Sequence, residues 1–235
     1  MSSVLLTRVE QDNKALAQEL KQKGYEVFEH PFLVIEPLDY ELPEPQNFSA
    51  LLFTSSKAVD YLKDSEELVH LPVFCVGSVT GDKVREKGLN IQKTYINVDE
   101  LIQDLNQMSF DSPLLYLSGR EIFKDLFQEL HHAVHRVELY NSIQVIDINE
   151  EIFLNSQIDS VLFYSRRTAE AFAKALETSP YSNEIKESIT RTSLLCLSDS
   201  MLNYLAYFPW KDVHVAEKPT HQDMIKKLEE IKNKG

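Results

Sequence analysis

The chain has 235 residues, of which 43% are hydrophobic and 26% charged, proportions usual for a soluble globular protein. Domains typically contain about 100 to 150 residues, so this length is enough for one large domain or two small ones. Acidic residues outnumber basic ones by 37 to 24, and the formal net charge of -13 repels the phosphates of nucleic acids and membranes. We therefore expect no nucleic-acid or membrane partner, and any acidic ligand must be held by local groups.

Short β-rich runs alternate with helical patterns along most of the chain. The predicted strands are 4–7, 25–28, 50–54, 73–76, 114–117, 160–164, 193–197 and 213–216. The predicted helices are 13–23, 57–62, 80–87, 99–108, 121–131, 168–178, 201–207 and 222–232. Strands that alternate with helices predict an α/β fold in which parallel sheets carry helices on both faces.

Two extended segments interrupt this alternation. Residues 31–46 contain four prolines, which exclude a helix or a central strand and favour an extended crossing followed by a surface loop. Further along the chain, residues 137–146 are again extended. If the two segments run side by side, they form a two-stranded connector between two lobes.

Two βα patterns recur in the same order. Residues 50–62 align without gaps on residues 160–172, and residues 73–84 align on residues 194–205. The matched pairs include Phe53 and Phe163, Ser55 and Ser165, and Cys75 and Cys196. Any two βα units share a general pattern, but two units in one order favour an internal repeat.

The repeat and the extended segments together predict two lobes. The first lobe contains residues 1–37 and 143–235, and the second contains residues 38–142. The connecting strands are residues 32–38 and 137–146.

The N-terminal sequence and the cysteines indicate a cytoplasmic protein. The first apolar run is too short for the core of a signal peptide, and nowhere do about 18 apolar residues follow one another. Cys75 and Cys196 lie inside apolar runs, which favours buried, reduced thiols over a disulfide.

Polar turns follow the predicted strands. In parallel sheets ligands collect at the carboxyl ends of the strands, where helix N-termini present unpaired N–H groups and a positive dipole. These turns are rich in hydroxyl groups, glycine or basic residues, which suits an anion such as a carboxylate. For Ser55, Ser165 and Ser200 the alternative is an ordinary helix N-cap.

Basic residues at the same turns need a different explanation. Lys and Arg in the first turn of a helix oppose its dipole and are commoner in the last turn. A basic lining for an acidic ligand accounts better for the four arginines at strand ends or first turns, which are Arg8, Arg120, Arg166 and Arg167.

Other chemistries have little support. The sequence contains no GxGxxG, P-loop or GxSxG motif, which argues against Rossmann dinucleotide binding, P-loop nucleotide binding and a nucleophile elbow. His131, His132 and His135 have helical spacing for a metal, but the Glu of an HExxH motif is absent. A position near the end of a helix explains these histidines better than a metal does.

With two lobes and polar turns at the strand ends, the sequence resembles the uroporphyrinogen-III synthase family. The order and spacing of the motifs carry the resemblance, which covers nearly the whole chain. The motifs are VLLTR (4–8), GYEVFEHPFLVIEP (24–37), LLFTSSKAV (51–59), VFCVGSVTGDKVREKGL (73–89), LYLSGRE (115–121), VELYNS (137–142), VLFYSRRTAEAF (161–172) and AEKPTHQDMIKKL (216–228).

The resemblance implies two flavodoxin-like lobes joined by an antiparallel pair of strands. It implies a lyase of tetrapyrrole (haem) biosynthesis, which cyclises hydroxymethylbilane, a linear tetrapyrrole with many carboxylates. The last pyrrole ring is inverted through a spiro intermediate to give uroporphyrinogen III. No cofactor or metal is implied, and nothing in the sequence requires more than a monomer.

The resemblance also assigns residues. The family's proton donor matches Tyr140, for which packing on a connector strand is an equally weighted alternative. The implied ligand contacts are Thr54, Ser55, Gly77, Ser78, Thr80, Ser118, Gly119 and Ser165 with its neighbours Arg166 and Arg167. With the turn residues Arg8 and Ser200, these form the predicted substrate site.

Two turns depart from the family pattern. Where the family often has SPS after the strand, this chain has Ser165, Arg166 and Arg167. Where the family often has IGPTTA, this chain has LSDSMLN, which places Asp199 in the position of the proline. An Asp carboxylate repels a ligand carboxylate, so either the contact has moved to the arginines or the activity is weakened or lost.

Two alternative functions follow. One is a catalytically impaired homologue that binds acidic tetrapyrroles or a partner protein. The other is an acidic two-lobed signalling or solute-binding protein. A phospho-receiver requires acidic residues at the end of its first strand, and Thr7 and Arg8 in that place argue against it.

Overall fold

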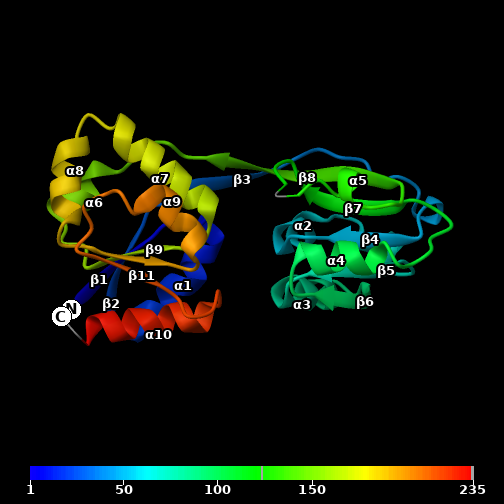
Figure 1. The fold of residues 1–235 in the computed structure, drawn as a ribbon, viewed down its shortest axis with the longest axis horizontal. Helices are drawn as coiled ribbons and strands as arrows, with labels where there is room; N and C mark the ends of the chain where they lie inside the picture. The colour runs from blue at the N-terminus through cyan, green and yellow to red at the C-terminus, as the bar shows by residue number, and fades with distance from the viewer. Residues whose placement is uncertain (123, 234–235) are drawn as a thin grey trace. The chain divides into compact units, whose positions relative to one another are not determined.

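The computed structural model of the protein describes residues 1–122 and 124–233. The chain divides into two compact units (Figure 1). The first unit comprises Met1–Val34 with Ile143–Gly235, and the second comprises Ile35–Ser142. Residues 234 and 235, which the sequence analysis included in the first lobe, lie outside the described residues.

The elements of the first unit alternate as βα pairs. Its strands are β1 (Ser2–Leu6), β2 (Tyr25–Glu29), β9 (Ser160–Phe163), β10 (Ser193–Cys196) and β11 (Asp212–Val215). Its helices are α1 (Glu10–Gln22), α6 (Glu150–Asn155), α7 (Arg166–Thr178), α8 (Ser182–Ile189), α9 (Leu202–Leu205) and α10 (His221–Lys232), with a 3₁₀ helix at Asp199–Met201.

The second sheet is built from the middle of the chain. Its strands are β3 (Leu33–Pro37), β4 (Ala50–Phe53), β5 (Pro72–Val76), β6 (Asn90–Tyr95), β7 (Leu114–Gly119) and β8 (Val134–Gln144). The helices beside it are α2 (Ser56–Tyr61), α3 (Ser78–Glu86), α4 (Val98–Leu105) and α5 (Leu126–Glu129), with 3₁₀ helices at Pro45–Asn47 and Ser65–Leu68.

The five strands of the first sheet are all parallel and lie in the order β11-β10-β9-β1-β2. Numbered by their order in the chain, they form a 2-1-3-4-5 arrangement, which is the strand order of flavodoxin. The prediction of an α/β fold with parallel sheets is therefore confirmed.

The second sheet has the order β3-β8-β7-β4-β5-β6. Its five strands β4 to β8 are parallel, and numbered by their order in the chain they form a 3-2-1-4-5 arrangement when read from the β6 edge. Strand β3 lies at the edge, where its proline is tolerated because an edge strand leaves one side of its backbone unpaired.

The two sheets are nevertheless related strand by strand. Strands β4, β5 and β6 occupy the same spatial order as β9, β10 and β11, while β7 and β8 occupy that of β1 and β2. The register agrees as well, because Phe53 pairs with Cys75 in one sheet and Phe163 pairs with Cys196 in the other. The units are therefore circular permutations of one arrangement, with the repeated βα patterns at the centre of each.

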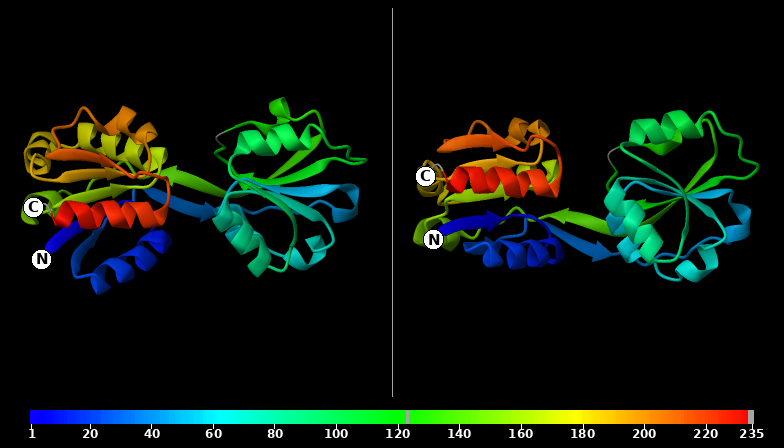
Figure 2. Two further views of the ribbon diagram at one scale, coloured as in Figure 1. Left: turned by 60° about the horizontal axis from the view of Figure 1, so that its bottom comes forward. Right: turned by 90° about the horizontal axis from the view of Figure 1, so that it is seen from below.

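Helices cover both faces of the first sheet (Figure 2). The alternation of side chains along β9 assigns residues to the two faces. Val161 and Phe163 belong to one hydrophobic cluster with Phe172 of α7. Leu162, which lies between them, belongs to another cluster with Met224 of α10. In Figure 1, α7 and α10 lie on opposite sides of this sheet.

The second sheet is layered in the same way. Leu51 and Phe53 of β4 cluster with Val59 of α2. Leu52 clusters instead with Ile102 of α4 on the other face. Each unit thus has three layers, and both faces of its central strand are buried, which explains why these strands are continuous apolar runs.

Some expected elements differ in the structure. The helix predicted over residues 121–131 is reduced to Leu126–Glu129, and residue 123 lies outside the described residues. His131 and His132 lie in a bend and His135 in β8, so their supposed helical spacing does not exist. Strand β6 and helices α6 and α8 were not predicted from the sequence. Within the described ranges, no helix combines the length and apolar character needed to cross a bilayer.

Candidate functional site

The predicted site residues fall into two groups, one at the carboxyl ends of the strands in each unit. In the second unit, Ser55 is the N-cap of α2, and its hydroxyl accepts a hydrogen bond from the Lys57 N–H at 3.2 Å. Gly77 is the N-cap of α3 and has a φ of 88°, a conformation that residues with a Cβ rarely adopt. Both turns therefore direct backbone N–H groups of a helix N-terminus away from the sheet.

Tyr140 contacts two of the other predicted residues, Ser55 and Gly119. Its hydroxyl lies 3.1 Å from Ser55 Oγ, which is hydrogen-bond distance. Its ring lies against Gly119, its partner in the β7–β8 register, where an added Cβ would approach Tyr140 Cζ to 2.5 Å. Gly119 is therefore required for the placement of the Tyr140 ring. Tyr140 is 8% exposed, so its ring is also packed against the sheet, as the alternative interpretation of this residue expects.

A second hydroxyl pair lies on the neighbouring strands. Thr54 Oγ1 and the Tyr116 hydroxyl are 2.7 Å apart. Burial raises the pKa of Tyr116, and the hydrogen bond with Thr54 acts in the opposite direction. The phenol therefore stays protonated near neutral pH.

Arg136 belongs to the same cluster, although the sequence analysis did not select it. Its Nε donates to Ser118 Oγ at 2.7 Å, and its Nη2 donates to the carbonyl oxygens of Gly119 and Arg120. Glu138 pairs with Arg120 at 2.9 Å and with Arg136 at 3.5 Å. Arg136 and Glu138 share one face of β8, while the register shift before Tyr140 places its ring on the other face, with Val137 and Leu139.

The predicted residues of the second unit differ in exposure. Ser118 is 2% exposed and Thr80 4% exposed, and the Ser118 hydroxyl also donates to the carbonyl oxygen of Gly119 at 3.0 Å. Both side chains are therefore turned away from solvent. Ser78 is exposed, while Thr54, Ser55 and Gly77 are partly exposed.

In the first unit, Arg8 follows β1 and is held by its surroundings. Its Nη2 lies 2.9 Å from Asp12 Oδ2, and its guanidinium carbon lies 4.5 Å from the centroid of the Tyr164 ring. Burial raises the pKa of the Tyr164 phenol, which the nearby Arg8 guanidinium partly opposes. Asp12 offsets much of the charge that Arg8 would offer to an anion.

Ser165, Arg166 and Arg167 lie at the start of α7. Ser165 is the N-cap, and its hydroxyl accepts from the Thr168 N–H at 3.2 Å. Arg166 and Arg167 are the first two helical residues, the former exposed and the latter partly exposed. Gln144 donates to the Arg167 carbonyl oxygen at 3.2 Å. Both arginines thus add positive charge at a helix N-terminus, the end that already favours anions.

Ser200 has a different setting from the other two serines. It lies inside the 3₁₀ helix, is exposed, and its Oγ is 2.9 Å from that of Ser198. Ser198 is the N-cap, although its side chain makes no capping hydrogen bond. The N-cap alternative therefore holds for Ser55 and Ser165 but not for Ser200.

The described residues contain no group of three or more His, Cys, Asp or Glu side chains that could hold a metal ion. What they provide is a set of hydroxyls, helix N-termini and arginines suited to carboxylates.

Comparison with known proteins decides the family. The family model described as uroporphyrinogen-III synthase HemD matches residues 14–226. The chain belongs to this family. It is 23% identical over 253 residues to the porphyrin biosynthesis protein HemD of Ruminiclostridium josui. That match covers 98% of this chain and 48% of the relative, so the chain spans about half the length of the curated relative it matches.

Solved structures from the family share the fold. The chain matches a mutant uroporphyrinogen III synthase from Thermus thermophilus with a TM-score of 0.64 and 16% identity, covering 100% of both chains. It matches uroporphyrinogen-III synthetase from Helicobacter pylori with a TM-score of 0.65 and 16% identity, covering 98% of this chain and 100% of the other.

Proposed function

We propose that this protein is a uroporphyrinogen-III synthase, a lyase that cyclises hydroxymethylbilane with inversion of the last pyrrole ring. Membership of the family supports the proposal. The observation that carries it is the Tyr140 hydroxyl, 3.1 Å from Ser55 Oγ at the N-terminus of α2, with its ring held against Gly119. This arrangement combines a proton donor with a helix end that attracts carboxylates.

In the proposed reaction, Tyr140 donates its proton to the hydroxyl of hydroxymethylbilane, which leaves as water. The resulting azafulvene cation is attacked by the substituted carbon of the last pyrrole, and the new bond forms a spiro intermediate. Cleavage of the old bond to that ring, followed by reclosure, inverts the ring. The proton released when the last pyrrole regains aromaticity restores the Tyr140 phenol.

Substrate conformation matters more than acid strength. Hydroxymethylbilane closes spontaneously to the uninverted isomer, so the protein must hold a conformation that disfavours direct closure. Many separate contacts to the carboxylates can do this. We assign them to the partly exposed or exposed groups Thr54, Ser55, Gly77, Ser78, Ser165, Arg166, Arg167 and Ser200, with Arg8 as a further base.

The more buried members of the predicted site have a supporting role in this proposal. Ser118, Thr80 and Gly119 fix the turns and the Tyr140 ring, and Arg136 ties Ser118 to β8. The reaction needs no cofactor or metal.

The proposal includes two flavodoxin-like lobes and a two-stranded connector made of β3 and β8. Two hydrogen bonds support an antiparallel pair. The Leu38 N–H donates to the Leu139 carbonyl oxygen, and the Val145 N–H donates to the Phe32 carbonyl oxygen, both at 3.0 Å. From Phe32 to Leu38 the residue number rises, while that of the bonded partner falls from Val145 to Leu139, as in antiparallel strands. We further propose a cytoplasmic monomer with residues 38–142 as its second lobe.

The direct test is incubation with enzymatically generated hydroxymethylbilane, followed by separation of the uroporphyrin isomers after oxidation. We expect the type III isomer to predominate. Formation of type I alone, at the rate of the spontaneous reaction, would exclude the synthase.

The turn at residues 198–200 favours a second candidate, an impaired homologue that binds acidic tetrapyrroles. Asp199 is exposed there and would repel a substrate carboxylate. Calorimetry distinguishes the candidates, since binding of uroporphyrinogen without turnover of hydroxymethylbilane supports the impaired homologue.

A further inference from the structure

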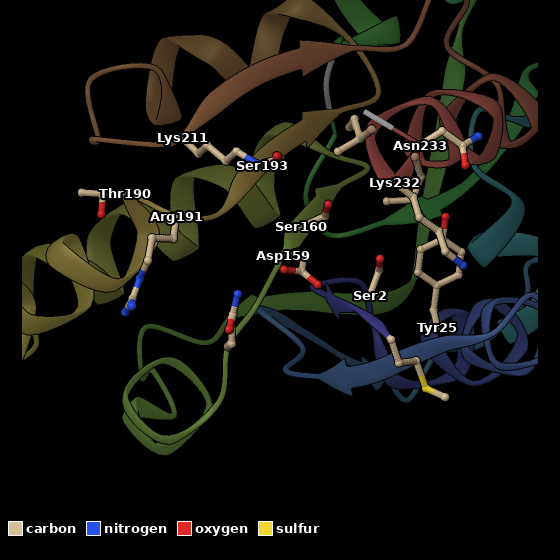
Figure 3. Close-up of a pocket in the computed structure, with 14 residues that line it drawn as sticks. Ser2, Tyr25, Asp159, Ser160, Thr190, Arg191, Ser193, Lys211, Lys232 and Asn233 are labelled. Atoms are coloured by element: carbon tan, nitrogen blue, oxygen red, sulfur yellow. The ribbon is translucent and has the colours of Figure 1, made fainter. Parts of the chain in front are cut away.

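A pocket of about 820 Å³ opens at the amino-end edge of the first sheet (Figure 3). It is lined by residues at the amino ends of the parallel strands, including Ser160 at the start of β9 and Ser193 at the start of β10. The proposed substrate-binding turns of this unit lie at the carboxyl ends of the same strands. Pockets of this size accommodate small organic ligands, and the proposed reaction has no use for this one.

Hydroxyls of buried residues in the lining have no partner among the described residues. Ser160 is 3% and Ser193 1% exposed, and neither hydroxyl makes a hydrogen bond within residues 1–122 and 124–233. The Tyr25 hydroxyl is also buried without a hydrogen-bond partner in that part of the chain. Burial of the Tyr25 hydroxyl is costly unless a ligand or water satisfies it, while the Ser160 and Ser193 hydroxyls remain available to a ligand in the pocket.

Basic side chains surround these hydroxyls. In Figure 3 the Lys211 side chain extends toward Ser193. Arg191 and Lys232 also line the pocket, and the Lys232 ammonium lies 4.3 Å from the centroid of the Tyr25 ring. Lys211 and Arg191 make no ion pair with any described residue. In a chain with a net charge of -13, two such cations in one pocket favour an anionic ligand.

Helix dipoles explain only part of this charge. Arg191 follows the end of α8 and Lys232 lies in the last turn of α10, where cations are favoured. Lys211 precedes β11 and belongs to no helix. The acid in the lining is Asp159, whose Oδ2 accepts from the Ser3 N–H at 2.8 Å and lies 3.3 Å from Ser3 Oγ. The Asp159 carboxylate therefore hydrogen-bonds to Ser3 and forms no ion pair with Lys211.

Apolar groups complete the lining. Leu228 and Ile231 of α10 and the ring of Tyr25 border the pocket. A ligand held here by an acidic group can therefore place an apolar body against α10.

We propose that this pocket binds a small organic acid, whose carboxylate or phosphate is held by Lys211, Ser193 and Ser160 and whose apolar part packs on Tyr25 and α10. The site is separate from the proposed substrate site and adds a second ligand to the protein.

The test uses the full chain and three fluorescent probes of similar shape. These are 1-naphthoate, 1-naphthyl phosphate and the cation 1-naphthylmethylamine, each titrated at pH 7 and followed by fluorescence. We expect both anions, or one of them, to bind at least about tenfold more tightly than the amine, because charged hydrogen bonds select the sign of the ligand. The tighter anion identifies the acidic group.

Variants assign the binding to the pocket. Lys211→Glu is expected to lower the affinity for the anionic probes by at least about tenfold, and Ser193→Ala is expected to lower it by about twofold to fivefold. Lys211→Gln provides a second variant if charge reversal disturbs folding, which thermal unfolding detects. The matched control is Lys226→Glu, an exposed lysine of the same unit that does not line the pocket.

Equal loss of anion affinity in Lys226→Glu and Lys211→Glu would show a general charge effect and overturn the proposal. Absence of binding by both anions, or amine binding as tight as theirs, would also overturn it. Type III isomer formation by Lys211→Glu is expected to match wild type. A protein that forms no type III isomer but retains the pocket-dependent binding would lose the synthase assignment and keep this one.

Discussion

The two units have the same spatial order of five parallel strands but different chemistry at the turns. In the second unit the central strand β4 leads to Ser55, which meets the hydroxyl of Tyr140. In the first unit the equivalent strand β9 leads to Ser165 and then to Arg166 and Arg167. The buried strands fix the register, while exposed turn residues can change without disturbing it. Fold is therefore shared between the units, and function must be argued from each turn separately.

A guanidinium lies at an equivalent strand end in both units, although it comes from different strands. Leu52 of β4 and Leu162 of β9 are equivalent in the repeat, and they pair with Tyr116 and Leu6, which are therefore equivalent too. Two residues further along these strands, Ser118 corresponds to Arg8. Arg8 provides its own guanidinium, which lies over Tyr164. Ser118 receives one from Arg136 on the neighbouring strand. Substitutions at residues that differ between the units, or that are equivalent in both, test this comparison.

The largest expected effect concerns Tyr140, for which the first unit has no proposed counterpart. Tyr140→Phe removes the proton donor but keeps the ring, so we expect kcat to fall by about tenfold to a hundredfold. Thermal unfolding should change little. Tyr61→Phe is the control, because its ring centroid lies 5.7 Å from that of Tyr140 and it has no part in the proposed reaction. An unchanged kcat for Tyr140→Phe would remove its acid role.

Gly119→Ala tests the close approach that only the second unit contains. The new Cβ would lie 2.5 Å from Tyr140 Cζ, so the ring must move and kcat must fall with it. Overpacking of this kind costs about 1–3 kcal/mol of unfolding free energy, which urea denaturation measures. Adding Tyr140→Ala removes the clash, so the two stability losses should not add. Additive losses would place the strain elsewhere.

The arginines test the turn of the first unit. We expect Arg166→Ala with Arg167→Ala to raise KM for hydroxymethylbilane by roughly tenfold, because carboxylate contacts are lost. Ser165→Ala should raise KM less and act mainly on stability through the lost N-cap. Removal of two exposed bases of the same unit, Lys21→Ala with Lys226→Ala, controls for net charge. If both double variants give the KM of wild type, the arginine pair is only surface charge.

The smallest effect compares the equivalent cysteines. Burial raises the pKa of the Cys196 thiol to about 12 and also raises that of Cys75, so both stay protonated. Thr94 Oγ1 lies 3.4 Å from Cys75 Sγ and can pair with a serine hydroxyl. Cys196→Ser should therefore destabilise the protein by about 1 kcal/mol more than Cys75→Ser in urea denaturation. The opposite order would indicate that the two positions are packed differently.

The central parts of both units could be predicted from the sequence. Buried strands such as Ser160–Phe163 are continuous apolar runs, and the N-caps Ser55 and Ser165 depend on hydrogen bonds within two or three residues. Both signals are local. The gapless repeat was also sufficient to match Phe53 with Phe163 and hence the register of the two sheets.

Elements at the edges and contacts between strands could not be predicted as well. Strand Asn90–Tyr95 lies at the edge of its sheet and is mostly polar, so it lacks the apolar run of a buried strand. Residues after Glu129 leave the helical pattern because Val134 pairs with Leu114 in the sheet. Arg136 acquires its partners only when β7 and β8 come together, so no pattern local to its own segment predicts them.

The circular permutation has a consequence for how the chain is made. All five parallel strands of the second sheet are contiguous in sequence and can pair while synthesis continues. In the first unit, β1 cannot pair with β9 until Val161, the partner of Leu5, has been synthesised. At about 5–20 residues per second, that interval is on the order of 10 to 30 s, during which β2 can pair with one edge of β1 but the edge that later meets β9 has no partner. The N-terminal segment is thus the part of this protein for which protection by a chaperone during translation matters most.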